Sequence, residues 1–125
     1  LTCLGDGNGD TEVLLKNAHS TQGVSLSYNT SSIPCFSVWK NTTALEDGFV
    51  TGIEPGTNYP NPRSYEGEQG RVIKLDPNGT ADLSLKMQFL TDERQVADSE
   101  KRIATLQENG VPTIHKKPQK GWCAP

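Results

Sequence analysis

The sequence lacks the features of several large classes of protein. Its 125 residues contain no apolar run near 18 residues, so no segment could form a transmembrane helix. The 12 lysines and arginines are outnumbered by 15 aspartates and glutamates, so the chain has no basic surplus for nucleic acid. No serine lies in a Gly-x-Ser-x-Gly elbow, which leaves a hydrolytic triad without support. We therefore expect neither a membrane nor a nucleic-acid partner.

Cysteine and metal-ligand motifs are also sparse. Cys3, Cys35 and Cys123 are too few and too far apart for a disulfide scaffold, and no Cys-x-x-Cys pair is present. The two histidines, His19 and His115, belong to no metal-binding spacing, and a surface or hydrogen-bonded role is favoured for each. We therefore predict no metal site, and we expect Cys35 to be a small buried hydrophobe.

The same shortage of cysteine bears on location. Because neither a disulfide framework nor a signal segment is visible, a cytoplasmic protein is favoured. Three Asn-x-Ser/Thr sequons keep a secreted or periplasmic protein open, although motifs this short also arise by chance. These sequons begin at Asn29, Asn41 and Asn78.

An acidic turn near the start of the chain has two interpretations. Asp6-x-Asn8-x-Asp10 is similar to the start of a calcium loop, but an EF-hand needs glycine at its sixth position and glutamate at its twelfth. Those positions hold Thr11 and Asn17. A turn rich in Gly, Asp and Asn explains the same residues without a metal, and we favour the turn.

Apolar and polar residues alternate along much of the chain, which predicts a mainly antiparallel β structure. The longest alternation places Ala81, Leu83, Leu85, Met87 and Phe89 on one face, which we expect to point inward. Hydrophobic residues make up only 33% of the chain, so the core of this single partial domain, residues 1–125, is thin. The strands, about 11–90 overall, are predicted at 11–17, 22–28, 36–39, 49–54, 71–75 and 80–90.

One helix is predicted near the C-terminus, over about 92–109. Thr91 can cap it, and Val96, Ile103 and Leu106 recur at helical spacing. Asn109-Gly110 is a natural stop. The tail, 110–125, is basic and contains proline, and we expect its Trp122 to dock against the body of the domain.

The region after the fourth predicted strand has the best candidate binding residues. Pro55 should end the pairing of that strand, and residues 55–70 should form a long loop, of the kind that often carries function. Glu54 ends the strand, and Gly52 leaves space beside its carboxylate for a ligand. The neighbouring amides, guanidinium and aromatic rings suit a sugar. These candidate substrate-binding residues are Asn58, Asn61, Arg63, Trp39 and Tyr59.

Three stretches in this part of the sequence point to a family. Residues 34–41 (Pro-Cys-Phe-Ser-Val-Trp-Lys-Asn), 52–58 (Gly-Ile-Glu-Pro-Gly-Thr-Asn) and 60–64 (Pro-Asn-Pro-Arg-Ser) strongly resemble the C-terminal part of aldose 1-epimerase-like proteins. These proteins belong to the galactose mutarotase-like superfamily, and the likeness is greatest to a little-characterised bacterial branch. The resemblance extends from Thr11 to the Pro-Thr-Ile-His tail. It implies an antiparallel β-sandwich, part of a larger supersandwich, with one C-terminal α-helix and an open sugar cleft.

The resemblance also implies a reaction. Glu54 matches the general base that takes the proton from the anomeric hydroxyl, while a histidine protonates the ring oxygen; no cofactor is needed. Family members are much longer, however, and their catalytic histidines lie well upstream of the glutamate. Neither His19 nor His115 matches those motifs. We therefore expect a C-terminal portion that supplies the base, needs the missing N-terminal part of the same fold, and is inactive as an isomerase by itself.

Two other functions stay open at this point. The chain could be a non-catalytic carbohydrate-binding module that holds a monosaccharide or sugar derivative without converting it. It could instead have a structural or assembly role, with the long loop as an interface and with self-association into a homo-oligomer. The identity of the sugar does not follow from the sequence.

Overall fold

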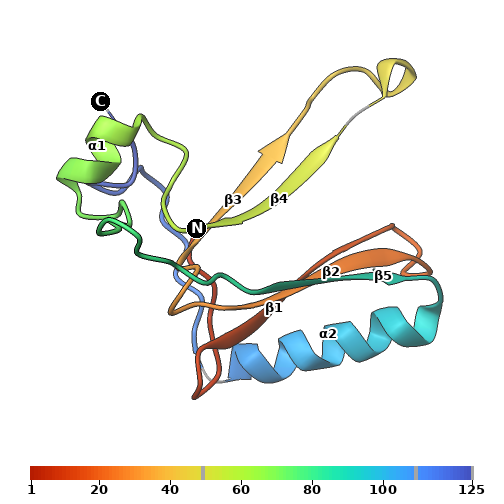
Figure 1. Cartoon of the computed structure of the whole chain (residues 1–125). Helices are drawn as coiled ribbons and strands as arrows, with labels where there is room; N and C mark the ends of the chain where they lie inside the picture. The colour runs from red at the N-terminus through yellow and green to blue at the C-terminus, as the bar shows by residue number, and fades with distance from the viewer. Residues whose placement is uncertain (49, 109, 125) are drawn as a thin grey trace.

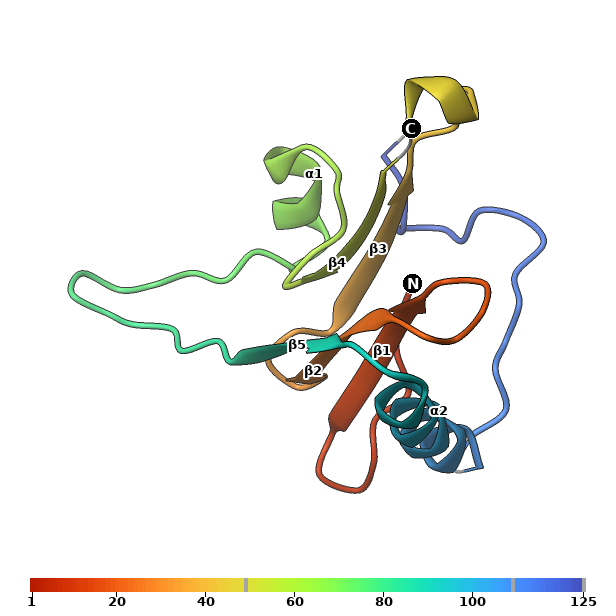
Figure 2. The ribbon, with the colours of Figure 1, turned by 90° about the vertical axis from the view of Figure 1, so that its right-hand side faces the viewer.

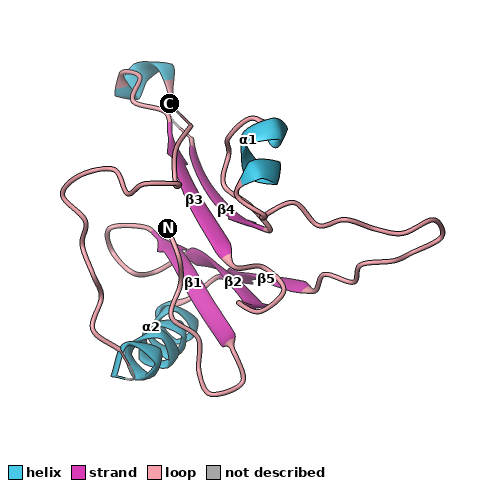
Figure 3. Ribbon diagram, turned by 90° about the vertical axis from the view of Figure 1, so that its left-hand side faces the viewer, coloured by secondary structure: helices cyan, strands magenta, loops and turns pink. Residues whose placement is uncertain are grey.

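The computed structural model describes residues 1–48, 50–108 and 110–124, which form two antiparallel sheets, a long helix and two short helical segments (Figures 1 and 3). The mainly antiparallel β fold with a C-terminal helix is thus confirmed. No helix of the described residues is long and apolar enough to cross a membrane. The elements are β1 (Asp10–Lys16), β2 (Gly23–Asn29), β3 (Cys35–Lys40), η1 (Leu45–Asp47), β4 (Thr51–Gly56), α1 (Arg63–Glu68), β5 (Leu85–Leu90) and α2 (Glu93–Glu108).

The larger sheet has the strand order β1-β2-β5, with both pairs antiparallel. Its register places Leu26 opposite Val13 on one side and Met87 on the other. Because side chains alternate between the two faces of a strand, one face of this sheet is apolar across all three strands. The opposite face contains Ser25 and Leu90, both buried, and α2 packs on it (Figure 1).

Helix α2 is fixed to the sheet by one carboxylate. Glu12 of β1 accepts hydrogen bonds from the Ser99 hydroxyl at 2.5 Å and from Arg102 Nε at 2.7 Å. Burial by itself would raise the pKa of Glu12, but these hydrogen bonds outweigh burial and lower that pKa below its usual value. Val96, one turn before Ser99, is fully buried. The predicted helical spacing therefore identified the buried face of the helix correctly.

The cap of α2 differs from the predicted one. Asp92, not Thr91, is the capping side chain, because its Oδ1 accepts the Gln95 amide at 2.8 Å. In turn, Oε1 of the Gln95 side chain accepts a hydrogen bond from the Thr91 amide at 3.0 Å. This reciprocal pair resembles a capping box, in which an aspartate satisfies a free amide of the first helical turn. The predicted stop at Asn109 lies outside the described residues.

The second sheet is the hairpin β3-β4. Contrary to the prediction, Pro55 does not end the pairing, since it lies opposite Phe36 and Gly56 lies opposite Cys35. A proline is tolerated here because a two-stranded sheet has only edge strands, where a missing N–H can face away from the partner strand. Between the two sheets lies a core of Tyr28, Ile33 and Phe36, against which Cys3, Val13 and Ile53 pack. Cys35 is buried, as predicted.

The segment before β5 departs most from expectation. Residues 71–75 and 80–84, both predicted as strands, are extended but belong to no sheet, and only 85–90 pairs, with β2. They form a long arm with a turn at its tip, where the Gly79 amide bonds to the Asp76 carbonyl (Figure 2). The expected inward row is also exposed: Leu83, Leu85, Met87 and Phe89 are 43–71% exposed. The reason is that no other element of the described chain covers this side of β5.

Adjacent residues of β5 should therefore differ sharply in their effect on stability. Leu90 is 2% exposed and Phe89 is 71% exposed. We expect Leu90→Ala to lower the free energy of unfolding by about 2–5 kcal/mol, because it leaves a cavity under α2. Phe89→Ala should change it by no more than about 0.5 kcal/mol. Urea unfolding of the 125-residue chain measures both, and equal losses would contradict the assigned faces.

Candidate functional site

The exposed face of the β3-β4 hairpin carries the predicted base. The register pairs Ser37 with Glu54 and Trp39 with Gly52, so all four residues point to the same side. Glu54 is exposed, and Trp39 is about half exposed. A Cβ at residue 52 would lie only 2.5 Å from Glu54 Oε1. The Glu54 carboxylate therefore lies across Gly52 and occupies the space that the sequence had suggested for a ligand; a larger residue at position 52 would have to displace this exposed side chain.

Beyond β4 the chain does not form the structureless loop that was predicted. Residues 63–68 fold into α1, and the Pro62 carbonyl accepts the Glu66 amide at 3.1 Å. Pro62 is the residue just before the helix: its backbone is extended, with ψ 138°, while its carbonyl already accepts the first helical hydrogen bond. This short helix carries Glu66 into the interior, where its side chain has no exposed surface.

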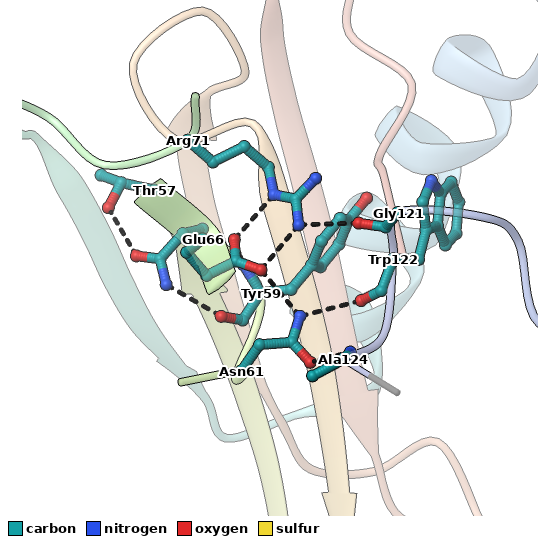
Figure 4. A network of polar contacts seen from close by, with 9 residues as sticks. Thr57, Tyr59, Asn61, Glu66, Arg71, Gly121, Trp122 and Ala124 are labelled. Atoms are coloured by element: carbon teal, nitrogen blue, oxygen red, sulfur yellow. Dashed lines mark hydrogen bonds and ion pairs between the residues drawn. The ribbon is translucent and has the colours of Figure 1, made fainter. Parts of the chain in front are cut away.

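Glu66 is the centre of a buried polar network (Figure 4). Arg71 binds it with two hydrogen bonds, Nε to Oε2 at 2.7 Å and Nη2 to Oε1 at 2.6 Å. Asn61 Nδ2 donates to Oε1 at 2.7 Å, and the Tyr59 amide donates to Oε2 at 3.2 Å. The hydrogen bonds from Arg71 are the largest influence and, against the cost of burial, hold the pKa of Glu66 at about 2. Glu66 is thus an ionised, fully bonded carboxylate.

The network also holds the C-terminal tail. Arg71 Nη2 donates to the Gly121 carbonyl at 2.7 Å, and Asn61 Nδ2 donates to the Trp122 carbonyl at 2.9 Å. The Ala124 amide donates to Asn61 Oδ1 at 3.0 Å. The Trp122 ring stacks on Tyr59 with a centroid distance of 5.4 Å (Figure 4). Trp122 is therefore the docking residue of the tail, as predicted.

Tyr59 connects this network to the hairpin. Its ring lies between Trp122 and the guanidinium of Arg71, which is 5.1 Å from the ring centroid. Burial is the main reason why the pKa of the Tyr59 hydroxyl and that of the Cys35 thiol are both raised, and each of these two groups also influences the pKa of the other. Cys35 lies opposite Gly56 on the same face as Glu54. The network therefore supports one end of the hairpin face that carries Glu54.

The predicted substrate-binding residues fall into two groups. Trp39 and Arg63 are exposed, and Arg63 lies in the first turn of α1. The other three take part in internal bonding. Tyr59 is 7% exposed under Trp122, and both ends of the Asn61 carboxamide are engaged by the network. Asn58 donates to the Tyr59 carbonyl at 2.8 Å and accepts from Thr57.

Sequence reasoning missed Glu66 and Arg71 as a pair. Glu66 lies in a stretch of small and charged residues, Glu-Gly-Glu-Gln-Gly, that is typical of an exposed loop. The only available signal was an arginine five residues later, and that spacing fits many surface pairs. Neither periodicity nor composition indicated that this carboxylate would be fully buried.

The other residues considered as metal ligands or catalytic groups have local structural roles. Asp6 Oδ1 accepts the amides of Asn8 and Asp10 at 2.8 and 3.0 Å, which accounts for the acidic turn. His19 lies in the turn between β1 and β2, and His115 packs edge-on against Trp122 at 5.7 Å. Within the described ranges, no three His, Cys, Asp or Glu side chains come together as they would in a metal site.

These features define a class of protein: a β-rich chain with two antiparallel sheets and an exposed carboxylate beside a tryptophan on the smaller one. The model of the family described as "Domain of unknown function (DUF4432)" matches residues 1–89. The chain belongs to this family. None of the curated proteins matches it.

A solved structure extends the comparison. The chain is similar to a protein from Klebsiella pneumoniae subsp. pneumoniae MGH 78578 that is described as a putative aldose 1-epimerase. The identity is 39%, the TM-score is 0.78, and the match covers 85% of this chain. It covers 28% of the Klebsiella chain, so our chain spans much less than half of its solved relative. The resemblance inferred from the sequence is thereby confirmed, and the match fits a C-terminal part of that fold.

The Glu66 network gives an expectation for acid stability. The carboxylate titrates at about 2 when folded, below its ordinary value of 4.5, so its contribution is fully present above pH 4.5. That contribution is lost as pH falls from 4.5 towards 2. We expect Glu66→Gln to be less stable than the wild type at pH 7 and to lose less further stability over this range. Urea unfolding at several pH values, followed by tryptophan fluorescence, measures the difference.

The matched control is Glu68→Gln, which removes an exposed carboxylate from the same helix. Its stability should follow the wild-type dependence on pH. Parallel curves for Glu66→Gln and the wild type would show that the buried carboxylate does not link stability to pH.

Proposed function

We propose that this chain supplies the general base of a sugar mutarotase-like site, with Glu54 as the base. The observation that carries the proposal is the position of Glu54: an exposed carboxylate on a hairpin, next to Trp39, in a chain 39% identical to part of a protein described as a putative aldose 1-epimerase. An exposed carboxylate in this setting is free to accept a proton from a bound hydroxyl.

The proposed reaction interconverts the two anomers of an aldose or sugar derivative. Glu54 takes the proton of the anomeric hydroxyl, the C1–O1 bond becomes a carbonyl, and the bond from C1 to the ring oxygen breaks. A proton donor on the opposite side supplies the proton to that ring oxygen. Rotation about the C1–C2 bond presents the other carbonyl face, and the reverse steps close the ring. Atoms and electrons balance without any cofactor.

The remaining residues have supporting roles in this proposal. Trp39 offers a flat exposed ring on which the apolar face of a sugar can pack. Arg63 is available for a hydroxyl or an acidic group of the substrate. Asn58, Asn61 and Tyr59 are bonded within the domain and would act by holding the loop between β4 and α1.

The proton donor is assigned to a part of the fold outside these 125 residues. Of the two histidines, His19 lies in a turn of the other sheet and His115 lies against Trp122 in the tail. The solved relative has a chain several times longer than the matched region, which leaves ample sequence for the donor. We therefore expect the isolated chain to be inactive and the complete protein to be active.

Glu54→Gln in the complete protein tests the proposal. Removing the base while keeping the size of the side chain should slow anomer exchange by about a hundredfold or more, as expected for loss of a general base. Polarimetry of freshly dissolved monosaccharides, corrected for spontaneous exchange, measures the rate. Glu68→Gln, on the exposed side of α1, is the matched control and should exchange at the wild-type rate.

An undiminished rate in Glu54→Gln would remove Glu54 from the mechanism. Calorimetry that detects sugar binding by a protein that never accelerates exchange would instead support the non-catalytic carbohydrate-binding module. In that case Glu54→Gln should change the Kd alone.

A further inference from the structure

The exposed apolar row on β5 and the arm is a surface feature that the proposed function does not use. It comprises Leu83, Leu85, Met87 and Phe89, and the other limb of the arm adds Ile73 and Leu75, which are also about half exposed. Alternation places Leu83 to Phe89 on one side of an extended segment. Several large apolar side chains grouped in this way are unusual on a free surface and indicate an interaction site.

The row continues a face that is already part of the core. Leu85, Met87 and Phe89 lie opposite Tyr28, Leu26 and Val24 of β2, so they share the face that the inter-sheet core covers. Tyr28 and Leu26 are buried, whereas Met87, one strand further, is 56% exposed. The layer above β1 and β2 therefore stops short of β5. Whatever covers the row must extend that same layer.

The backbone of this region is also unpaired on one side. β5 is the last strand in the order β1-β2-β5, so its outer edge has no partner among the described residues. Within the described part of residues 72–84, the arm's backbone bonds to itself only at the turn from Asp76 to Gly79 (Figure 2). An extended segment with open hydrogen-bonding groups and an alternating apolar row has the properties of a strand that joins a sheet.

We propose that this row and edge bind β-strands from the remainder of the aldose epimerase-like fold, the part that these 125 residues do not span. The length of the relative supports this occupant, because the matched region is only 28% of the Klebsiella chain. A second copy of this chain is the alternative occupant, and a homodimer through the row is one outcome of the test below. The inference depends on the shared fold and goes beyond the proposed sugar chemistry.

Co-expression tests the inference directly. A tagged form of this chain is produced together with the portion of the Klebsiella protein outside the matched region, so neither partner has to fold alone. We expect a 1:1 complex by light scattering and slower amide hydrogen exchange over residues 83–90 in the complex. No sugar is present, so failure here is distinguishable from failure of the proposed catalysis.

Charged substitutions locate the contact. Met87→Glu combined with Phe89→Glu should weaken the complex by at least about 30-fold, the effect of losing one interface hot spot. Gln88→Glu introduces one negative charge on the opposite face of β5 and should leave the affinity unchanged. Because residues 87 and 89 are exposed, the isolated double variant should melt within a few degrees of the wild type. If the double variant melts at a much lower temperature, the affinity is measured instead with Leu83→Glu, because residue 83 lies in the arm outside the sheet.

Three results would overturn the inference. One is a complex whose affinity is unaffected by the row variants, and another is the absence of any complex on co-expression. The third is a homodimer of this chain that protects residues 83–90 from exchange, which would make a second copy the occupant.

Discussion

The ion pair between Glu66 and Arg71 joins the loop after β4 and helix α1 to the C-terminal tail, which lies about 50 residues further along the chain. One carboxylate with no exposed surface receives hydrogen bonds from Arg71, Asn61 and the Tyr59 amide. Through Arg71 and Asn61 the same network binds the tail at residues 121–124. Because a buried charge is tolerated only when it is fully paired, each member constrains the others. The loop after β4, helix α1 and the tail therefore form one unit beside the hairpin.

This arrangement divides the residues near the smaller sheet into those that support the structure and those that are proposed to act on a substrate. Tyr59 and Asn61 are polar or aromatic residues near a strand end, as binding residues often are, yet they are bonded within the domain. Glu54 and Trp39 lie on the exposed face of the same hairpin, and the chain leaves β4 directly into Tyr59 and Asn61 of the network. The proposed base thus lies on a hairpin whose end continues into the buried network, and such support helps to position a catalytic group.

Local patterns predicted the strands and the helix because those elements depend mainly on their own residues. Alternation identified β1 and β2, and helical spacing identified the buried Val96. The failures depended on distant partners. Residues 80–84 have the pattern of a strand but no neighbouring strand among the described residues, and Pro55 is tolerated because β4 is an edge strand. Likewise, the burial of Glu66 requires Arg71 and the tail together, which no short-range pattern encodes. The place of Glu54 at a strand end marked it as a candidate, and the resemblance to a known family supplied its predicted role as a base.

The central claim is that this chain holds the base of a mutarotase-like site whose proton donor lies in another part of the fold. Magnetisation transfer between the anomeric protons of an aldose at equilibrium tests this claim most directly, with each part measured alone and then as the complex. The expected result is that neither part accelerates exchange and that the complex does. Full activity of this chain alone, or a stable complex that accelerates exchange of no aldose, would contradict the claim.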